Sequence, residues 1–157
     1  MDLSSLDLGR AGEDFTVALL GSKGFVASKL RVNAPTYDLE VVRGSSRFFV
    51  SVKVSREKQH VRLGSRRSVL NLTQGNFVFA YMPPVGARID GFPSPYVLLI
   101  LPAEIARDEA LSIHDRYWIN KSKDPNTFSV MVKGYGSHHR EMWPRWLSYQ
   151  EAWGLLP

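Results

Sequence analysis

The sequence predicts an α/β domain in which helices flank a central mixed sheet. Helical and strand patterns follow one another irregularly, which favours a sheet with both parallel and antiparallel pairs. Residues 48–54, FFVSVKV, are apolar almost without interruption, which is typical of a strand covered on both faces. The chain has no GxGxxG motif and no GxxxxGKS or GxxxxGKT motif, which argues against a doubly wound nucleotide-binding fold.

Length and composition indicate one globular domain spanning residues 1–157. The chain has 44% hydrophobic and 22% charged residues, which is ordinary for a soluble protein. No apolar run approaches the roughly 20 residues that span a bilayer, and the acidic start lacks the pattern of a signal peptide. Cysteine is absent, which excludes disulfides and thiolate metal sites. We therefore expect a cytoplasmic protein with no membrane partner.

The first half of the chain predicts a helix, three strands and a basic connection. The helix covers residues 8–22, and its apolar stripe follows helical spacing through Leu8, Ala11, Phe15, Ala18 and Leu19. A strand follows at 25–32, and residues 37–56 predict two strands joined by a polar turn that contains glycine and two serines. Residues 57–72 are polar and basic, and they predict a loop or a short irregular helix.

The second half of the chain predicts further strands and a closing helix. The clearest strand patterns are NFVFAYM at 76–82 and YVLLIL at 96–101, with a proline- and glycine-rich loop between them. The weaker patterns predict a short helix at 102–110, a strand pair at 116–120 and 127–133, and a tryptophan-rich helix at 144–155.

The predicted hairpin at 37–56 carries the most informative polar side chains. Asp38 and Glu40 share one face of its first strand, because side chains alternate along a strand. Ser51 and Lys53 share one face of its second strand for the same reason. Carboxylates beside a lysine are the parts of a metal-assisted site that cleaves phosphodiesters. A lysine inside an apolar strand is also costly unless it is paired or catalytic.

The net charge of +5 is concentrated in the first half of the chain. Residues 1–70 contain 12 Lys and Arg against 7 Asp and Glu, whereas residues 71–157 contain 8 of each sign. A basic patch beside a metal-type site favours a polyanionic partner, and the alternative is a solvated basic loop. The candidate nucleic-acid contacts are Arg56, Lys58, Arg62, Arg66 and Arg67.

Three segments within residues 9–56 together resemble the conserved motifs of a known protein family. The first runs from Gly12-Glu13 to Lys23-Gly24-Phe25, the second is TYDLEV at 36–41, and the third is FVSVKVS at 49–55. They resemble the first helix, the aspartate strand and the (D/E)XK strand of the PD-(D/E)XK nuclease superfamily. The likeness is to its small members, akin to archaeal Holliday-junction resolvases and restriction endonucleases. It implies a restriction-endonuclease-like α/β sandwich.

The resemblance also implies roles for individual residues. Asp38 would be the main metal ligand, and Glu13 would be the helix acid that contacts metal or water. Lys53 would orient the attacking water or help to deprotonate it. The implied cofactor is Mg²⁺, with Mn²⁺ as a substitute, and the implied function is a DNA endonuclease. RNA also fits the basic charge.

Serine occupies position 51, where the motif of the family has an acid. Glu40 on the aspartate strand, or Glu13 on the helix, could supply the missing carboxylate to the metal. Alternatively, the site no longer cleaves, and the chain is a nucleic-acid-binding or assembly module on the same fold. The sequence leaves these outcomes open.

Two other groups of residues are candidates for function. His114, His138 and His139 could bind a metal, but the neighbouring glycine and serine favour a surface loop. The closing helix has aromatic and polar residues at helical spacing, which favours packing over base stacking: Trp146, Tyr149, Gln150 and Trp153. This helix could also support a homodimer.

Overall fold

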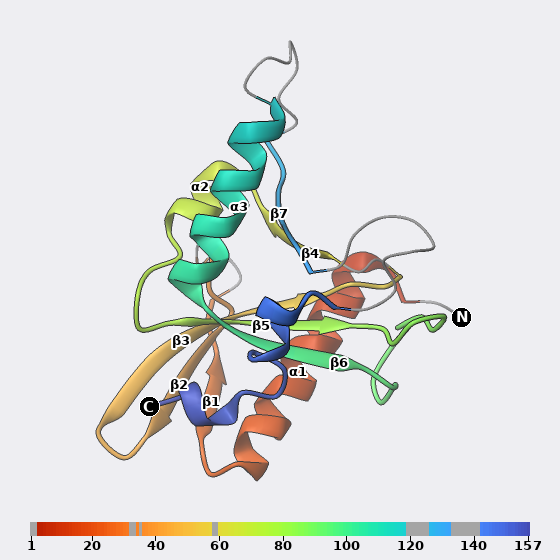
Figure 1. The fold of residues 1–157 in the computed structure, drawn as a ribbon. Helices are drawn as coiled ribbons and strands as arrows, with labels where there is room; N and C mark the ends of the chain where they lie inside the picture. Colours follow the sequence, from red (N-terminus) through yellow and green to blue (C-terminus); the bar gives the residue numbers. More distant parts are fainter. Residues whose placement is uncertain (1–2, 32–33, 35, 58–59, 119–125, 133–141) are drawn as a thin grey trace.

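The computed structural model describes residues 3–31, 34, 36–57, 60–118, 126–132 and 142–157. They form a five-stranded sheet, a two-stranded sheet and several helices (Figure 1). In chain order the elements are α1 (Ser5–Ser22), β1 (Val26–Lys29), β2 (Leu39–Arg43), β3 (Ser46–Val54), β4 (His60–Gly64), α2 (Arg66–Leu70), β5 (Phe77–Met82), β6 (Val97–Pro102), α3 (Ala103–Trp118), β7 (Phe128–Met131), α4 (Pro144–Leu147) and the 3₁₀ turn η1 (Trp153–Leu155).

The five-stranded sheet is mixed and has the order β1-β2-β3-β5-β6. β3 and β5 are parallel, and the other neighbouring pairs are antiparallel. β5 is buried along its whole length, and Val50, Ser51 and Val52 of β3 are buried in succession. Burial of consecutive residues means that both faces of these strands are covered. The α/β sandwich with a central mixed sheet is therefore confirmed.

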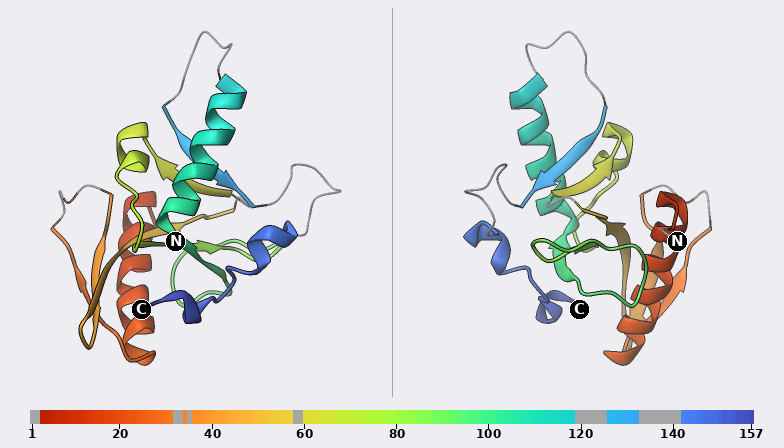
Figure 2. Two further views of the ribbon diagram at one scale, coloured as in Figure 1. Left: turned by 60° about the vertical axis from the view of Figure 1, so that its left-hand side comes forward. Right: turned by 90° about the vertical axis from the view of Figure 1, so that its right-hand side faces the viewer.

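The two faces of the large sheet carry different layers (Figures 1 and 2). α1 packs on one face, over a core that includes Leu39, Val50 and Phe79. The opposite face is covered by α3 and by the two-stranded β4–β7 ribbon, over a second core that includes Val78 and Trp146. Residues of α1, of β4 and of the C-terminal end of β3 line one cavity, so this end of β3 lies between α1 and the ribbon.

α1 approaches β3 closely because small residues face the sheet. Its buried residues are Leu8, Gly12, Thr16 and Leu20. The predicted apolar stripe was partly wrong, since Ala18 is exposed. The Thr16 hydroxyl donates to the Gly12 carbonyl at 2.6 Å and lies 2.7 Å from the Tyr81 hydroxyl. Burial raises the pKa of Tyr81, so this buried pair of hydroxyl groups stays neutral.

Two elements differ from the sequence prediction in the middle of the chain. Residues 57–72 were predicted as a loop or short helix, but they contain β4 as well as α2, because β4 pairs with the distant β7. The helix predicted at 102–110 continues to Trp118, so the strand predicted at 116–120 is wrong where the structure describes it. No helix of the described residues is long and apolar enough to cross a membrane.

The closing helix is much shorter than predicted, because α4 ends at Leu147. The chain then extends along β6. The Tyr149 carbonyl accepts from the Ile100 amide at 2.8 Å, and the Glu151 amide donates to the Leu98 carbonyl at 2.9 Å. The helical spacing of the aromatic residues in this segment therefore does not correspond to one helix, although Trp146 is buried as predicted.

Candidate active site

Asp38 directly precedes β2, and its carboxylate is hydrogen-bonded to β3 at the end of the β2–β3 pair. Its Oδ2 accepts a hydrogen bond from the Val52 amide at 2.7 Å, and its own amide donates to the Val50 carbonyl at 2.9 Å. Strand amides point within the plane of a sheet. The Asp38 carboxylate therefore lies at the end of the β2–β3 pair, where side chains from either face can reach it.

Glu13 of α1 brings a second carboxyl group to Asp38. The two side chains lie within hydrogen-bonding reach of each other. Burial raises the pKa of Glu13, and the nearby charge of Asp38 raises it further. Two carboxyl groups this close favour a shared proton or a bound cation.

Lys29 of β1 also contacts Glu13, and no sequence pattern points to it. Its Nζ lies 2.8 Å from Asp14 and 3.6 Å from Glu13. The hydrogen bond to Asp14 is the main cause that raises the pKa of Lys29. The β1–β2 register places Lys29 opposite Leu39, next to Asp38. A single lysine on a short strand gives no sequence signal, and only the strand pairing shows its position.

A Glu13→Gln variant is expected to show a weaker dependence of stability on pH. The raised pKa means that the fold holds the Glu13 proton more tightly than the unfolded chain does. The free energy of unfolding therefore falls as pH rises from the ordinary pKa of 4.5 through the raised one. Glutamine removes this loss, which we expect to be under about 1 kcal/mol for a partly exposed group.

Urea unfolding in EDTA at about pH 4 and about pH 8 measures the Glu13 effect. Wild type is expected to lose more stability than Glu13→Gln between the two conditions. Added Mg²⁺ should then stabilise wild type more than the variant, because the variant lacks one ligand. Equal pH profiles would show that the fold does not raise the pKa of Glu13.

Ser51 is fully buried on β3, and its hydroxyl has no hydrogen-bond partner among the described residues. The register pairs Val50 with Leu39, so the next residue, Ser51, lies beside Asp38 across the two strands. A buried polar group without a partner costs about 1–3 kcal/mol. This hydroxyl is therefore an unused oxygen in the core, on the residue across the ladder from Asp38.

A Ser51→Ala variant is expected to raise the free energy of unfolding in EDTA by about 1 kcal/mol, because it removes the unpaired hydroxyl. The matched control is Ser55→Ala, which removes a hydroxyl that donates to the His60 carbonyl at 2.7 Å. That control is expected to lower the free energy of unfolding by about 1 kcal/mol. Urea unfolding of both variants checks the contrast. A loss of stability in Ser51→Ala equal to that in Ser55→Ala would show that Ser51 is hydrogen-bonded after all.

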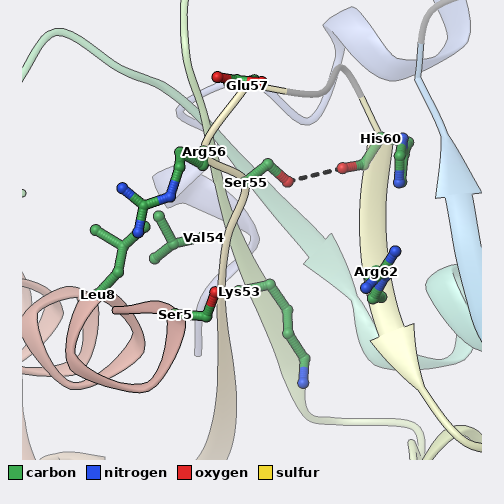
Figure 3. Close-up of a pocket in the computed structure, with 9 residues that line it drawn as sticks. All are labelled: Ser5, Leu8, Lys53, Val54, Ser55, Arg56, Glu57, His60 and Arg62. Atoms are coloured by element: carbon green, nitrogen blue, oxygen red, sulfur yellow. Dashed lines mark hydrogen bonds between the residues drawn. The ribbon is translucent and has the colours of Figure 1, made fainter. Parts of the chain in front are cut away.

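Lys53 lies on the same face of β3 as Ser51, two residues further along. It is half-buried and lines a cavity of about 450 Å³ at the end of β3. Figure 3 shows its side chain reaching from β3 into the space between β3 and β4. The structure therefore brings Glu13 and Asp38 together, and it places Ser51 and Lys53 on the neighbouring strand, with Ser51 across the ladder from Asp38.

Glu40 has a different partner. Its Oε2 lies 3.0 Å from Arg47 of β3, and the register places Glu40 opposite Phe49. Arg47 in turn lies over the Phe49 ring. Glu40 lies two residues along the strand from Asp38, where it is paired with Arg47. The structure does not bring Glu40 to Glu13.

The candidate nucleic-acid contacts fall into distinct environments. Arg56 forms an ion pair with Asp90 at 2.8 Å. Arg66 forms one with Asp115 at 3.2 Å. Arg67 of α2 is exposed, and Arg62 of β4 is exposed at the rim of the cavity that contains Lys53. Lys58 lies outside the described residues.

The oxygen atoms around Asp38 suit a hard divalent cation. The described part of the chain has no group of three or more His, Cys, Asp or Glu side chains that could hold a metal. The Asp38 and Glu13 carboxyl groups nevertheless supply oxygen donors from two elements. Mg²⁺ prefers oxygen, keeps several waters and needs only one or two carboxylates beside a phosphate. The residues present therefore fit Mg²⁺.

The histidine alternative receives no support at His114, which is buried in α3 and does not lie on a surface loop. Its ring stacks on Phe128 with 3.8 Å between the ring centroids. His138 and His139 lie outside the described residues.

The mixed sheet with α1 on one face and α3 and the β4–β7 ribbon on the other can be compared with solved structures. Two solved nuclease structures have this fold. The bacterial homing endonuclease I-Ssp6803I aligns with 97% of this chain and 90% of its own, with a TM-score of 0.55 and 17% identity. Hjc, a Holliday junction resolvase from the archaeal hyperthermophile Archaeoglobus fulgidus, aligns with 78% of this chain and 83% of its own, with a TM-score of 0.51 and 15% identity.

Both neighbours are PD-(D/E)XK-type nucleases. The chain therefore has the restriction-endonuclease-like fold, and the resemblance found in its sequence is confirmed at the level of the fold. No protein-family model and no curated protein matches the chain significantly.

Proposed function

We propose that this protein is a divalent-metal-dependent DNA endonuclease. The observation that carries the proposal is the interaction between the Glu13 and Asp38 carboxyl groups at the end of the β2–β3 pair. Such a cluster of oxygens is unfavourable in an empty site and favourable around a cation. The nuclease fold supports the same conclusion, since both structural neighbours are named as enzymes that act on DNA junctions or as endonucleases.

Each residue has a separate part in the proposed reaction. Asp38 and Glu13 would hold Mg²⁺, or Mn²⁺ in its place. The bound metal would polarise the phosphate and lower the pKa of a coordinated water. Lys53 would orient the attacking water and stabilise the negative charge that develops on the phosphate oxygens. The Val52 amide holds the Asp38 carboxylate at the end of the sheet throughout.

A non-catalytic nucleic-acid-binding or assembly module is the second candidate. Two observations favour it. Ser51 replaces a carboxylate, and a hydroxyl is a poorer Mg²⁺ ligand. The Asp38 carboxylate also already accepts a hydrogen bond from Val52. Such a module would bind DNA in a salt-sensitive manner without cutting it.

Incubation with supercoiled plasmid, branched DNA and single-stranded RNA tests the proposal. Wild type is expected to cut DNA with Mg²⁺ or Mn²⁺ and to be inactive in EDTA. Asp38→Asn is expected to lose about 10²-fold or more in rate, because it removes the main ligand charge. Asp108→Asn is the matched control, since Asp108 is an exposed acid of α3 whose partner is Arg107. Cleavage by Asp38→Asn at the wild-type rate would contradict the site. DNA binding without cleavage of any substrate would favour the second candidate.

A further inference from the structure

The cavity at the end of β3 lies between the catalytic strand and the β4–β7 ribbon. Lys53 and Ser55 line it from the β3 side, Arg62 and His60 line it from β4, and Ser5 lines it from α1. Its volume of about 450 Å³ is within the range of sites that hold small ligands. The side chain of Lys53, the proposed catalytic lysine, therefore borders a space large enough for part of a nucleic-acid backbone.

Some of the cationic side chains that line this cavity already form ion pairs, and others do not. Arg56 is engaged by Asp90 at 2.8 Å, and in Figure 3 it points toward α1 and away from Arg62. Glu57, the acid at the rim of the cavity, forms an ion pair with Arg88. The ion pairs of the described residues involve neither Lys53 nor Arg62. These two cations are therefore the charges that a phosphate in the cavity would meet.

Arg62 also has a well-defined position relative to the catalytic strand. Its neighbours Val61 and Leu63 are buried in the core, which directs the Arg62 side chain outward. The Ser55 hydroxyl donates to the His60 carbonyl at 2.7 Å, and this bond ties the start of β4 to the end of β3 (Figure 3). The ribbon thus presents Arg62 on the far side of the cavity from the strand of Lys53.

We propose that this cavity is a subsite for a second phosphate of the bound DNA strand, and that Arg62 is the positioning residue that holds it. The planar guanidinium of arginine binds phosphate oxygens in a bidentate manner. Lys53 acts at the bond that is cut, whereas Arg62 sets the register of the strand relative to that bond. This inference rests on the proposed function only for the identity of the cut bond.

Binding of a short fluorescent DNA duplex in EDTA tests the subsite without cleavage. Arg62→Ala is expected to lower the slope of log affinity against log salt by about 0.9, the value for one lost phosphate contact. It should weaken binding roughly tenfold at low salt, the size of one charge-assisted hydrogen bond. Arg62→Lys should restore the slope. The control is Arg43→Ala, at the end of β2 far from Asp38, which should leave the slope unchanged.

Methylphosphonate substitution locates the second phosphate. Neutralising one phosphate at a time in the duplex should identify a position that weakens wild type but not Arg62→Ala, as expected for a coupled pair. The inference is overturned if Arg62→Ala keeps the wild-type slope, if Arg43→Ala lowers it equally, or if no such position exists. Failure of wild type to cut DNA, with these binding results intact, would refute the endonuclease and retain the subsite.

Discussion

A Lys53→Met variant is expected to cut DNA about 10²–10³-fold more slowly than wild type, the usual cost of removing one group that stabilises the developing charge. Methionine keeps the length and the apolar stem of the side chain in the half-buried position on β3, but it removes the ammonium group. The fold and the metal ligands should therefore be retained. Single-turnover cleavage of plasmid at saturating protein measures the rate without a contribution from DNA affinity.

The matched control for Lys53→Met is Lys23→Met at the C-terminal end of α1. Lys23 lies over the Trp153 ring, with 5.1 Å from Nζ to the ring centroid, and it does not line the cavity. This control should cut at the wild-type rate. A normal rate in Lys53→Met would show that the ammonium takes no part in the reaction, whatever the metal does.

A Gly12→Ala variant is expected to lower the free energy of unfolding by about 1–3 kcal/mol, although alanine normally favours a helix. A Cβ at position 12 would lie 2.5 Å from Cγ2 of Val54 and 3.5 Å from Cγ1 of Val52. Both valines belong to the strand that carries Lys53, so α1 must move away from β3. Since Glu13 follows on the same helix, the apparent affinity for Mg²⁺ should fall as well.

Urea unfolding and Mg²⁺ titration of four variants check the Gly12 effect. Gly9→Ala in α1 is the control, because a Cβ there meets nothing within 4 Å, and it is expected to stabilise the protein by about 0.5–1 kcal/mol. Adding Val54→Ala to Gly12→Ala should cost less than the sum of the two single changes, because the clash is removed. Additive losses would show that Val54 does not limit the approach of α1.

The sequence was sufficient for the parts of the site that depend on local pattern. The hairpin of β2 and β3, the position of Asp38 and the shared face of Ser51 and Lys53 all follow from alternation along adjacent strands. The helix that carries Glu13 follows from helical periodicity. These features are short-range, and the chemistry of an acid and a lysine in an apolar hairpin is specific enough to suggest a nuclease.

The features that sequence reasoning missed depend on pairing between distant segments. β4 is a strand because it pairs with β7, more than 60 residues away, and its basic composition hid the alternation of Val61 and Leu63. Lys29 reaches Glu13 only because β1 lies beside β2. The environment of Ser51 could not be inferred either, because the absence of a partner is a property of the packed core.

The extended segment at 149–151 has a consequence for the behaviour of the protein in concentrated solution. It occupies backbone groups of Leu98 and Ile100 at the outer edge of the large sheet. An uncovered edge strand is a template for strand addition by another molecule. A chain cut before Tyr149 would therefore be prone to self-association through β6, and the last residues of the sequence protect the protein against aggregation.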